Sequence, residues 1–244
     1  MTISPLFSKA LLVALTTCLA MTTHAHTPLA ETLSARQQAL VSIAALTAKG
    51  DLPHLHDALA QGLDAGLTVN EEKEELVHLY AYCGFPRSIN GLNILLKVLD
   101  ERQAQGKKDV IGKAASPITS TAPKYERGKK VLEQLTGRPE KEPKTGYGAF
   151  SPEIDRFLKE HLFADIFERD VLTYQERELV TIAALVSLGG VEPMLQGHLD
   201  IGLHTGLTAT QLQQLMRVME AAVGKQEADA GRAVLTKMLA TKPK

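Results

Sequence analysis

A glutamate and a histidine in the last third of the chain have the spacing of an acid–base pair. Glu178 and His198 have their midpoint at residue 188, beside the Gly189-Gly190 turn. If two antiparallel helices meet at this turn, both residues lie at the same height, about 15 Å from the turn at a rise of 1.5 Å per residue. A carboxylate beside an imidazole fixes the ring tautomer and tunes its proton affinity, as general acid–base catalysis requires. The alternative interpretation is a structural hydrogen bond between two buried polar groups.

Hydrophobic spacing predicts that both members of the pair face a core. Glu178 shares a helix face with Ile182 and Leu185. Around His198, residues recur with the i, i+3, i+4, i+7 spacing of a buried helix face. These neighbours are Val191, Met194, Leu195, Leu199 and Gly202.

The elements that would position this pair belong to an internal duplication. Leu40–Leu46 and Leu179–Leu185 read LVSIAAL and LVTIAAL and differ at one position. After a one-residue shift in register the correspondence continues, which indicates two copies of one structural unit. The matched residues are Pro53 with Pro193, Gly62-Leu63 with Gly202-Leu203, Gly66-Leu67-Thr68 with Gly206-Leu207-Thr208, and Gly84 with Gly224.

Each copy reads as helices separated by short turns, and sustained strand-like alternation is absent. Capping-box patterns begin several apolar-periodic runs: Ser34 with Gln37, Thr68 with Glu71, Thr173 with Glu176, and Thr208 with Gln211. The sequence therefore predicts an all-α fold of tandem helical repeats. We expect helices over 34–49, 53–64, 69–83, 86–104, 123–136, 152–162, 174–188, 192–205, 209–223 and 225–240.

The first residues have the pattern of a secretory signal peptide. Lys9 precedes the apolar run Ala10–Ala20, and the small residue Ala25 suits cleavage. We therefore expect a periplasmic or secreted protein. The expected domains are a signal peptide at 1–25, a shortened first repeat at 26–105, a linker at 106–122 and a second repeat at 123–244. Within the second repeat, 137–148 reads as a mobile loop with solvated lysines.

Composition narrows the classes of partner. The chain has 27 Lys and Arg against 28 Asp and Glu, a formal net charge of −1, so charge gives no reason to expect nucleic acid or anionic lipid as partner. No segment after the signal is long and charge-free enough to predict a membrane span. No metal or nucleotide motif is present, so we expect a small-molecule substrate and no cofactor.

The second copy, with its upstream segment, resembles the carboxymuconolactone decarboxylase family, which includes alkylhydroperoxidase-type proteins. The resemblance implies an all-α, alkylhydroperoxidase-like fold that assembles into rings, hence a homo-oligomer. It covers about residues 124–244 and rests on Tyr125–Gly128, Leu162–Phe167, Arg177–Leu185, His198 and Gly206–Thr208. In the first copy, Tyr82–Ser88 looks family-like as well.

Some members of this family reduce peroxides with a Cys-x-x-Cys pair, and others use acid–base chemistry on lactone acids. The matching region here, Leu188–Met194, has no cysteine. Of the two cysteines, Cys18 lies in the predicted signal, so Cys83 alone would remain. A dithiol cycle needs a second, resolving thiol, which the mature chain would lack.

Each copy holds chemistry-bearing residues that the other lacks. The first copy has Ala39 and Ala58 at the positions of Glu178 and His198. It carries a second set instead: His78, Tyr82, Cys83 and Arg87. We hypothesise one composite pocket, in which the second set binds substrate beside the Glu–His pair and Arg87 holds a substrate carboxylate.

The second set also has plainer interpretations. Tyr82 and Cys83 fit core packing, because Leu76, Tyr80 and Cys83 form a plausible buried stripe. Arg87 fits a surface charge at a helix start.

Three functions stay open at this point. The first is a cofactor-independent lyase or isomerase that decarboxylates, isomerises or opens a small lactone, enol or unsaturated acid. In it His198 would transfer the proton, and Glu178 would act as the base that orients His198. The second is a peroxiredoxin-type activity that uses Cys83 as a lone peroxidatic thiol. The third is a binding or assembly protein without catalysis.

Overall fold

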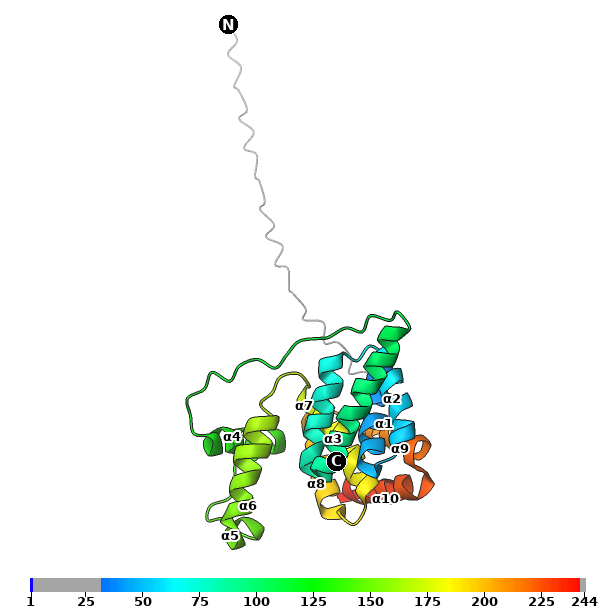
Figure 1. The fold of residues 1–244 in the computed structure, drawn as a ribbon. Coiled ribbons are helices and arrows are strands. Elements are labelled where there is room, and N and C mark those ends of the chain that lie inside the picture. Colours follow the sequence, from blue (N-terminus) through cyan, green and yellow to red (C-terminus); the bar gives the residue numbers. More distant parts are fainter. Residues whose placement is uncertain (2–31, 242–244) are drawn as a thin grey trace. The chain divides into compact units, whose positions relative to one another are not determined.

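The architecture comes from a computed structural model that describes Met1 and residues 32–241 (Figure 1). All regular structure in this part of the chain is helical, as the sequence predicts. The predicted signal peptide lies outside the described residues apart from Met1. None of the described helices combines the length and apolar character that crossing a membrane requires.

The helices follow the two predicted copies. The first copy forms α1 (Ala35–Lys49), α2 (Leu52–Asp64) and α3 (Val69–Ala104). The segment after it forms α4 (Lys124–Thr136), α5 (Tyr147–Phe150), α6 (Pro152–Phe157) and the π-helix η1 (Leu158–Ile166). The second copy forms α7 (Tyr174–Leu188), α8 (Glu192–His204), α9 (Ala209–Val223) and α10 (Lys225–Thr241).

Capping boxes fix where four of these helices begin. A complete capping box closes the first turn of α1, α3, α7 and α9, at Ser34, Thr68, Thr173 and Thr208. In each box the side-chain oxygen of the Ser or Thr accepts a hydrogen bond from the backbone N–H of the residue three positions later. The Glu or Gln side chain of that residue accepts one from the backbone N–H of the Ser or Thr. Equivalent helices of the two copies therefore start in the same register.

A glycine at the same place breaks the helical path in both copies. Gly84 inside α3 has φ 82° and ψ 159°, and Gly224 between α9 and α10 has φ 109° and ψ 168°. These backbone angles suit glycine and strain any residue with a Cβ. α3 is therefore two helices joined end to end, equivalent to α9 and α10, and the duplication extends to the backbone.

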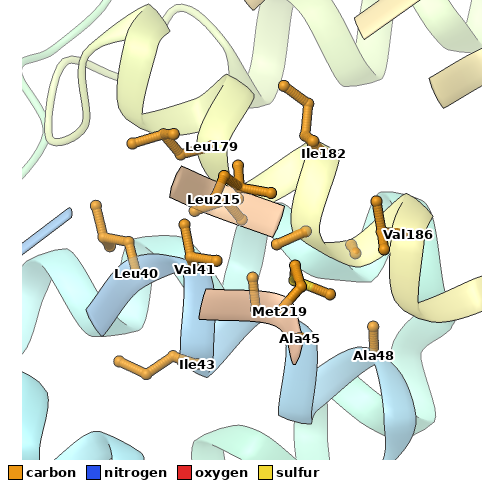
Figure 2. Packing of buried hydrophobic residues seen from close by; sticks show 14 of the residues in the cluster. Leu40, Val41, Ile43, Ala45, Ala48, Leu179, Ile182, Val186, Leu215 and Met219 are labelled. Atoms are coloured by element: carbon orange, nitrogen blue, oxygen red, sulfur yellow. The ribbon is translucent and has the colours of Figure 1, made fainter. Parts of the chain in front are cut away.

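The core lies where α1 and α7 pack against each other. Both helices are buried on most sides, which explains why their sequences lack a polar stripe. Figure 2 shows their side chains converging with Leu215 and Met219 of α9. The labelled core residues of α1 and α7 are Leu40, Val41, Ile43, Ala45, Ala48, Leu179, Ile182 and Val186.

A second, smaller core joins α4 to η1. Val131 and Leu135 of α4 pack with Phe163 and Phe167 in this cluster, which also contacts Tyr82 of α3. Helical structure here continues to Ile166, beyond the predicted end at 162, and α5 was not predicted.

The two helices approach unusually closely at Gly128. A Cβ at this position would lie 1.8 Å from the Lys159 carbonyl oxygen, so α4 tolerates no side chain there.

The loop over 137–148 differs from the prediction of solvated lysines. Lys144 forms an ion pair with Asp155 at 2.7 Å and donates a hydrogen bond to the Tyr125 hydroxyl. Asp155 is also paired with Lys159. Burial opposes ionisation of Asp155, but Lys144 and the other donors outweigh it and lower its pKa to about 2. The loop is therefore tied to α4 and α6 by a charged cluster, while Lys141 is exposed as expected.

Candidate active site

Glu178 and His198 meet as their spacing predicts. Glu178 on α7 accepts a hydrogen bond at Oε2 from Nδ1 of His198 on α8, across 2.8 Å. The Glu178 side chain is 0% exposed and that of His198 is 16% exposed. A carboxylate can only accept at this contact, so the imidazole proton of the neutral ring lies on Nδ1. Nε2 therefore keeps its lone pair for a proton from a bound molecule.

The first copy contributes two aromatic side chains to this pair. The Tyr82 ring lies edge-on to the His198 ring, with centroids 5.6 Å apart and planes at 80°. His78 lies 5.2 Å from Tyr82, centroid to centroid. Both residues come from α3, so side chains of the two copies meet here, which is the part of the composite hypothesis that concerns His78 and Tyr82.

Behind the pair runs a buried chain of polar contacts. His78 contacts Thr181 through Nε2 at 2.8 Å, and Arg177 approaches its Nδ1 at 3.3 Å. Because Arg177 can only donate, Nδ1 of His78 accepts and its Nε2–H donates to the Thr181 hydroxyl. Arg177 in turn pairs with Glu74 at 2.7 Å. These contacts lock the ring of His78 in one tautomer.

Burial keeps both aromatic partners of the pair uncharged. Burial lowers the pKa of His78 well below its usual range, and the neighbouring charge of Arg177 adds to this shift. Burial also raises the pKa of Tyr82 above its usual range, with the Glu178 carboxylate adding to the rise and the Thr181 hydroxyl opposing it. A neutral phenol and a neutral imidazole therefore surround the Glu–His pair at ordinary pH.

Two polar atoms at the pair lack a hydrogen bond of standard geometry. They are Oε1 of Glu178 and the hydroxyl oxygen of Tyr82, and both are buried. Most buried polar atoms in proteins have partners, because an unpaired one is destabilising. Both atoms therefore keep hydrogen-bonding capacity that the contacts within the described residues leave unused.

Cys83 and Arg87 lie apart from these contacts. The Cys83 thiol donates to the Leu79 carbonyl oxygen at 3.1 Å, and burial raises its pKa to about 11 despite the opposing charge of Arg87. Arg87 lies beside Gly50 at the turn between α1 and α2, with Nε 4.0 Å from where a Cβ would stand. It makes no hydrogen bond or ion pair in the described part of the chain, and its role as a substrate anchor stays a prediction.

Comparison with known families identifies the two repeats. The family model described as "Carboxymuconolactone decarboxylase family" matches residues 14–97 and 152–237. The chain belongs to this carboxymuconolactone decarboxylase family. The first match begins within the segment predicted as a signal peptide, and the second begins at α6. A search of curated proteins found no match.

Sequence reasoning missed several polar residues that support the pair in this family member. They are Glu74, Arg177 and Thr181. A usable signal was present for Thr181, which is the polar residue within the otherwise apolar run Leu179–Leu185 of α7. Within the described residues, no group of three His, Cys, Asp or Glu side chains is placed to hold a metal ion.

Two details of the predicted buried faces were wrong. Met194, expected on the inward face of α8, is 55% exposed. On α3 the expected stripe through Tyr80 and Cys83 is only half-buried, while Leu76 and Leu79 are fully buried with the polar residues. The helix packs through a mixed polar and apolar face because α7 offers it Arg177 and Thr181, which an apolar-periodicity argument cannot find.

Proposed function

We propose that this protein is an exported, cofactor-independent enzyme that moves protons on a small lactone, enol or unsaturated acid. The observation that carries the proposal is the 2.8 Å contact between buried Glu178 and partly exposed His198. The contact leaves Nε2 as the proton acceptor, and family membership supplies precedent for decarboxylase-like chemistry.

In the proposed reaction, His198 acts first as base and then as acid. Nε2 takes a proton from the substrate, and the imidazolium that forms is stabilised by the buried Glu178 carboxylate. The same proton then returns to another atom of the substrate, so the enzyme ends unchanged. The neutral Tyr82 hydroxyl is a donor that can stabilise oxyanion character as it develops.

The direct test compares turnover by the wild type, His198→Ala and Glu178→Gln on a panel of lactone, enol and unsaturated acids. We expect kcat to fall by about 10²- to 10⁴-fold in His198→Ala, with circular dichroism unchanged. Added imidazole should restore part of that activity, which a merely structural histidine would not allow. His54→Ala, on an exposed histidine of α2, is the matched control and should keep full activity.

Two outcomes would contradict the proposal. One is wild-type turnover in a folded His198→Ala variant. The other is no turnover of any acid in the panel by the wild type.

The structure disfavours peroxidase chemistry at Cys83. A peroxidatic cysteine reacts as its thiolate, and burial raises the pKa of Cys83 to about 11. The second repeat has no cysteine to resolve an oxidised thiol. We therefore place redox chemistry below proton transfer.

Export and self-association are part of the proposal. The signal-like pattern of residues 1–25 supports export. Large apolar side chains on α5 and α6 support contact with another copy, because monomers rarely expose such groups together. Among them Phe150 is 92% exposed, Tyr147 58% and Phe157 56%.

A further inference from the structure

A groove occupies the place in the first repeat that corresponds to the Glu–His site of the second. It has a volume of about 830 Å³ and lies between α1, α2 and α9. Volumes of this size are typical of small-molecule binding sites. Its lining includes Gln38, Ala39, Ala58, Arg217 and Ala222.

The groove exists because the first repeat has alanine where the second has large side chains. Ala39, Ala58 and Ala222 stand at the positions that correspond to the glutamate of the pair, its histidine and the tyrosine beside them. Val218 likewise replaces the buried histidine of α3. The two repeats thus share the helices around this place and differ in the side chains that fill it.

The covering elements also differ between the repeats. In the second repeat, η1 and the residues after it pack on the site, and the Phe167 ring lies 5.1 Å from that of His78. In the first repeat, the described residues hold no helix before α1 that corresponds to η1.

The polar groups of the lining favour an anionic ligand. Arg217 is exposed and makes no hydrogen bond or ion pair within the described residues. The other ionisable groups of the lining are already engaged: His54 with Asp51 at 2.8 Å, and Asp57 with His56 at 3.1 Å. Arg217 is therefore the charged side chain of this lining that has no partner among the described residues, and it lies beside a floor of alanine methyl groups.

We propose that this groove binds a small amphipathic organic anion, with its acid group on Arg217 and its apolar body against the alanines. The site is non-catalytic, since it holds neither the glutamate nor the histidine of the second repeat. The proposal is independent of whether the Glu178–His198 pair is catalytic.

The probe for this test is 8-anilinonaphthalene-1-sulfonate, which combines an aromatic body with one anionic group. Fluorescence titration and calorimetry of the wild type should show one saturable site per chain. Ala222→Tyr fills the groove with the side chain that the second repeat carries, and Arg217→Gln removes the charge. Arg217→Gln should raise the Kd by about tenfold or more, since a charge-assisted hydrogen bond is worth that factor. Ala222→Tyr should raise the Kd by at least as much, because its ring occupies the space of the ligand's apolar body. Ala233→Tyr, at an exposed alanine of α10, should leave the Kd unchanged.

Several results would overturn the proposal. One is an unchanged Kd in Arg217→Gln; this exposed substitution leaves the core intact, so the test stands even if Ala222→Tyr folds poorly. Equal loss of binding in the Ala233→Tyr control would place the probe elsewhere. Failure of the wild type to bind, together with dissociation of an assembly by Ala222→Tyr, would show that a second copy occupies the groove.

Discussion

Neighbouring buried glutamates of α3 have very different surroundings. Glu74 is 2% exposed and pairs with Arg169 and Arg177. Glu72 and Glu75 are 0% exposed, and their carboxyl oxygens have no hydrogen-bond partner of standard geometry. A buried carboxyl without a cation avoids ionisation by keeping its proton.

The pH dependence of stability should reveal the protonated state of Glu72. Burial raises its pKa to about 9, against an opposing effect of the Arg102 charge. The folded protein keeps this proton up to about pH 9, whereas the unfolded chain releases it near pH 4.5. The contribution to stability is therefore complete below about pH 4.5 and is lost as the pH rises towards 9. Glu72→Gln should raise the free energy of unfolding at about pH 8 by roughly 2–4 kcal/mol and leave it similar at about pH 4.

Urea unfolding of both proteins across this pH range measures the difference. The control is Glu126→Gln, at an exposed glutamate of α4, which should not alter the pH profile. A wild type whose stability does not fall between about pH 5 and pH 9 would contradict the protonated state of Glu72.

The reactivity of Cys83 is a second prediction at this scale. Because burial raises the pKa of its thiol to about 11, the thiolate fraction at neutral pH is small. Alkylation by iodoacetamide at about pH 7.5 should be on the order of 100-fold slower than in the urea-unfolded chain, whose thiol ionises normally. The alkylation rate of the folded protein should still increase at pH values where the alkylation rate of a free thiol has become constant. Equal alkylation rates in the folded and unfolded chains would contradict the raised pKa of Cys83 and support a redox role for its thiol.

At the scale of the elements, the non-helical backbone at Gly84 sets the change of direction between the two halves of α3. Its φ of 82° with ψ of 159° belongs to a region that is essentially restricted to glycine. Gly84→Ala should lower the free energy of unfolding by roughly 1–3 kcal/mol. Gly197→Ala is the matched control: this residue lies within α8 with open space around its Cα, so alanine should raise stability by up to about 1 kcal/mol. Thermal unfolding of the two variants should shift in opposite directions.

Most element boundaries could be predicted because the sequence marks them with local chemistry. The capping boxes and the repeated motif give the starts of α1, α3, α7 and α9, and the glycines give several ends. The contact of Glu178 with His198 also follows from spacing around one turn. The extension of η1 and the support by Glu74 could not be predicted, because each depends on packing between segments far apart in the sequence.

At the scale of the whole molecule, buried charge links the two repeats. Glu74 belongs to the first repeat and Arg177 to the second, and both are buried. Removing one member of a buried ion pair leaves the other uncompensated, so Glu74→Gln should lower the free energy of unfolding by roughly 3–5 kcal/mol. Glu220→Gln breaks an exposed ion pair with Arg232 and should change the free energy of unfolding by less than about 1 kcal/mol. Similar effects of the two substitutions in chemical denaturation would contradict this role for Glu74.

The placement of Glu74 and Arg177 on different repeats also constrains how the chain can evolve. A substitution at either residue leaves a buried partner more than a hundred positions away without its counter-charge, so the two halves share one structural constraint. Joining two second repeats would double the Glu–His pair but place Gln214, which corresponds to Glu74, opposite each Arg177. Each buried guanidinium would then lack its carboxylate, so the two halves are no longer interchangeable modules.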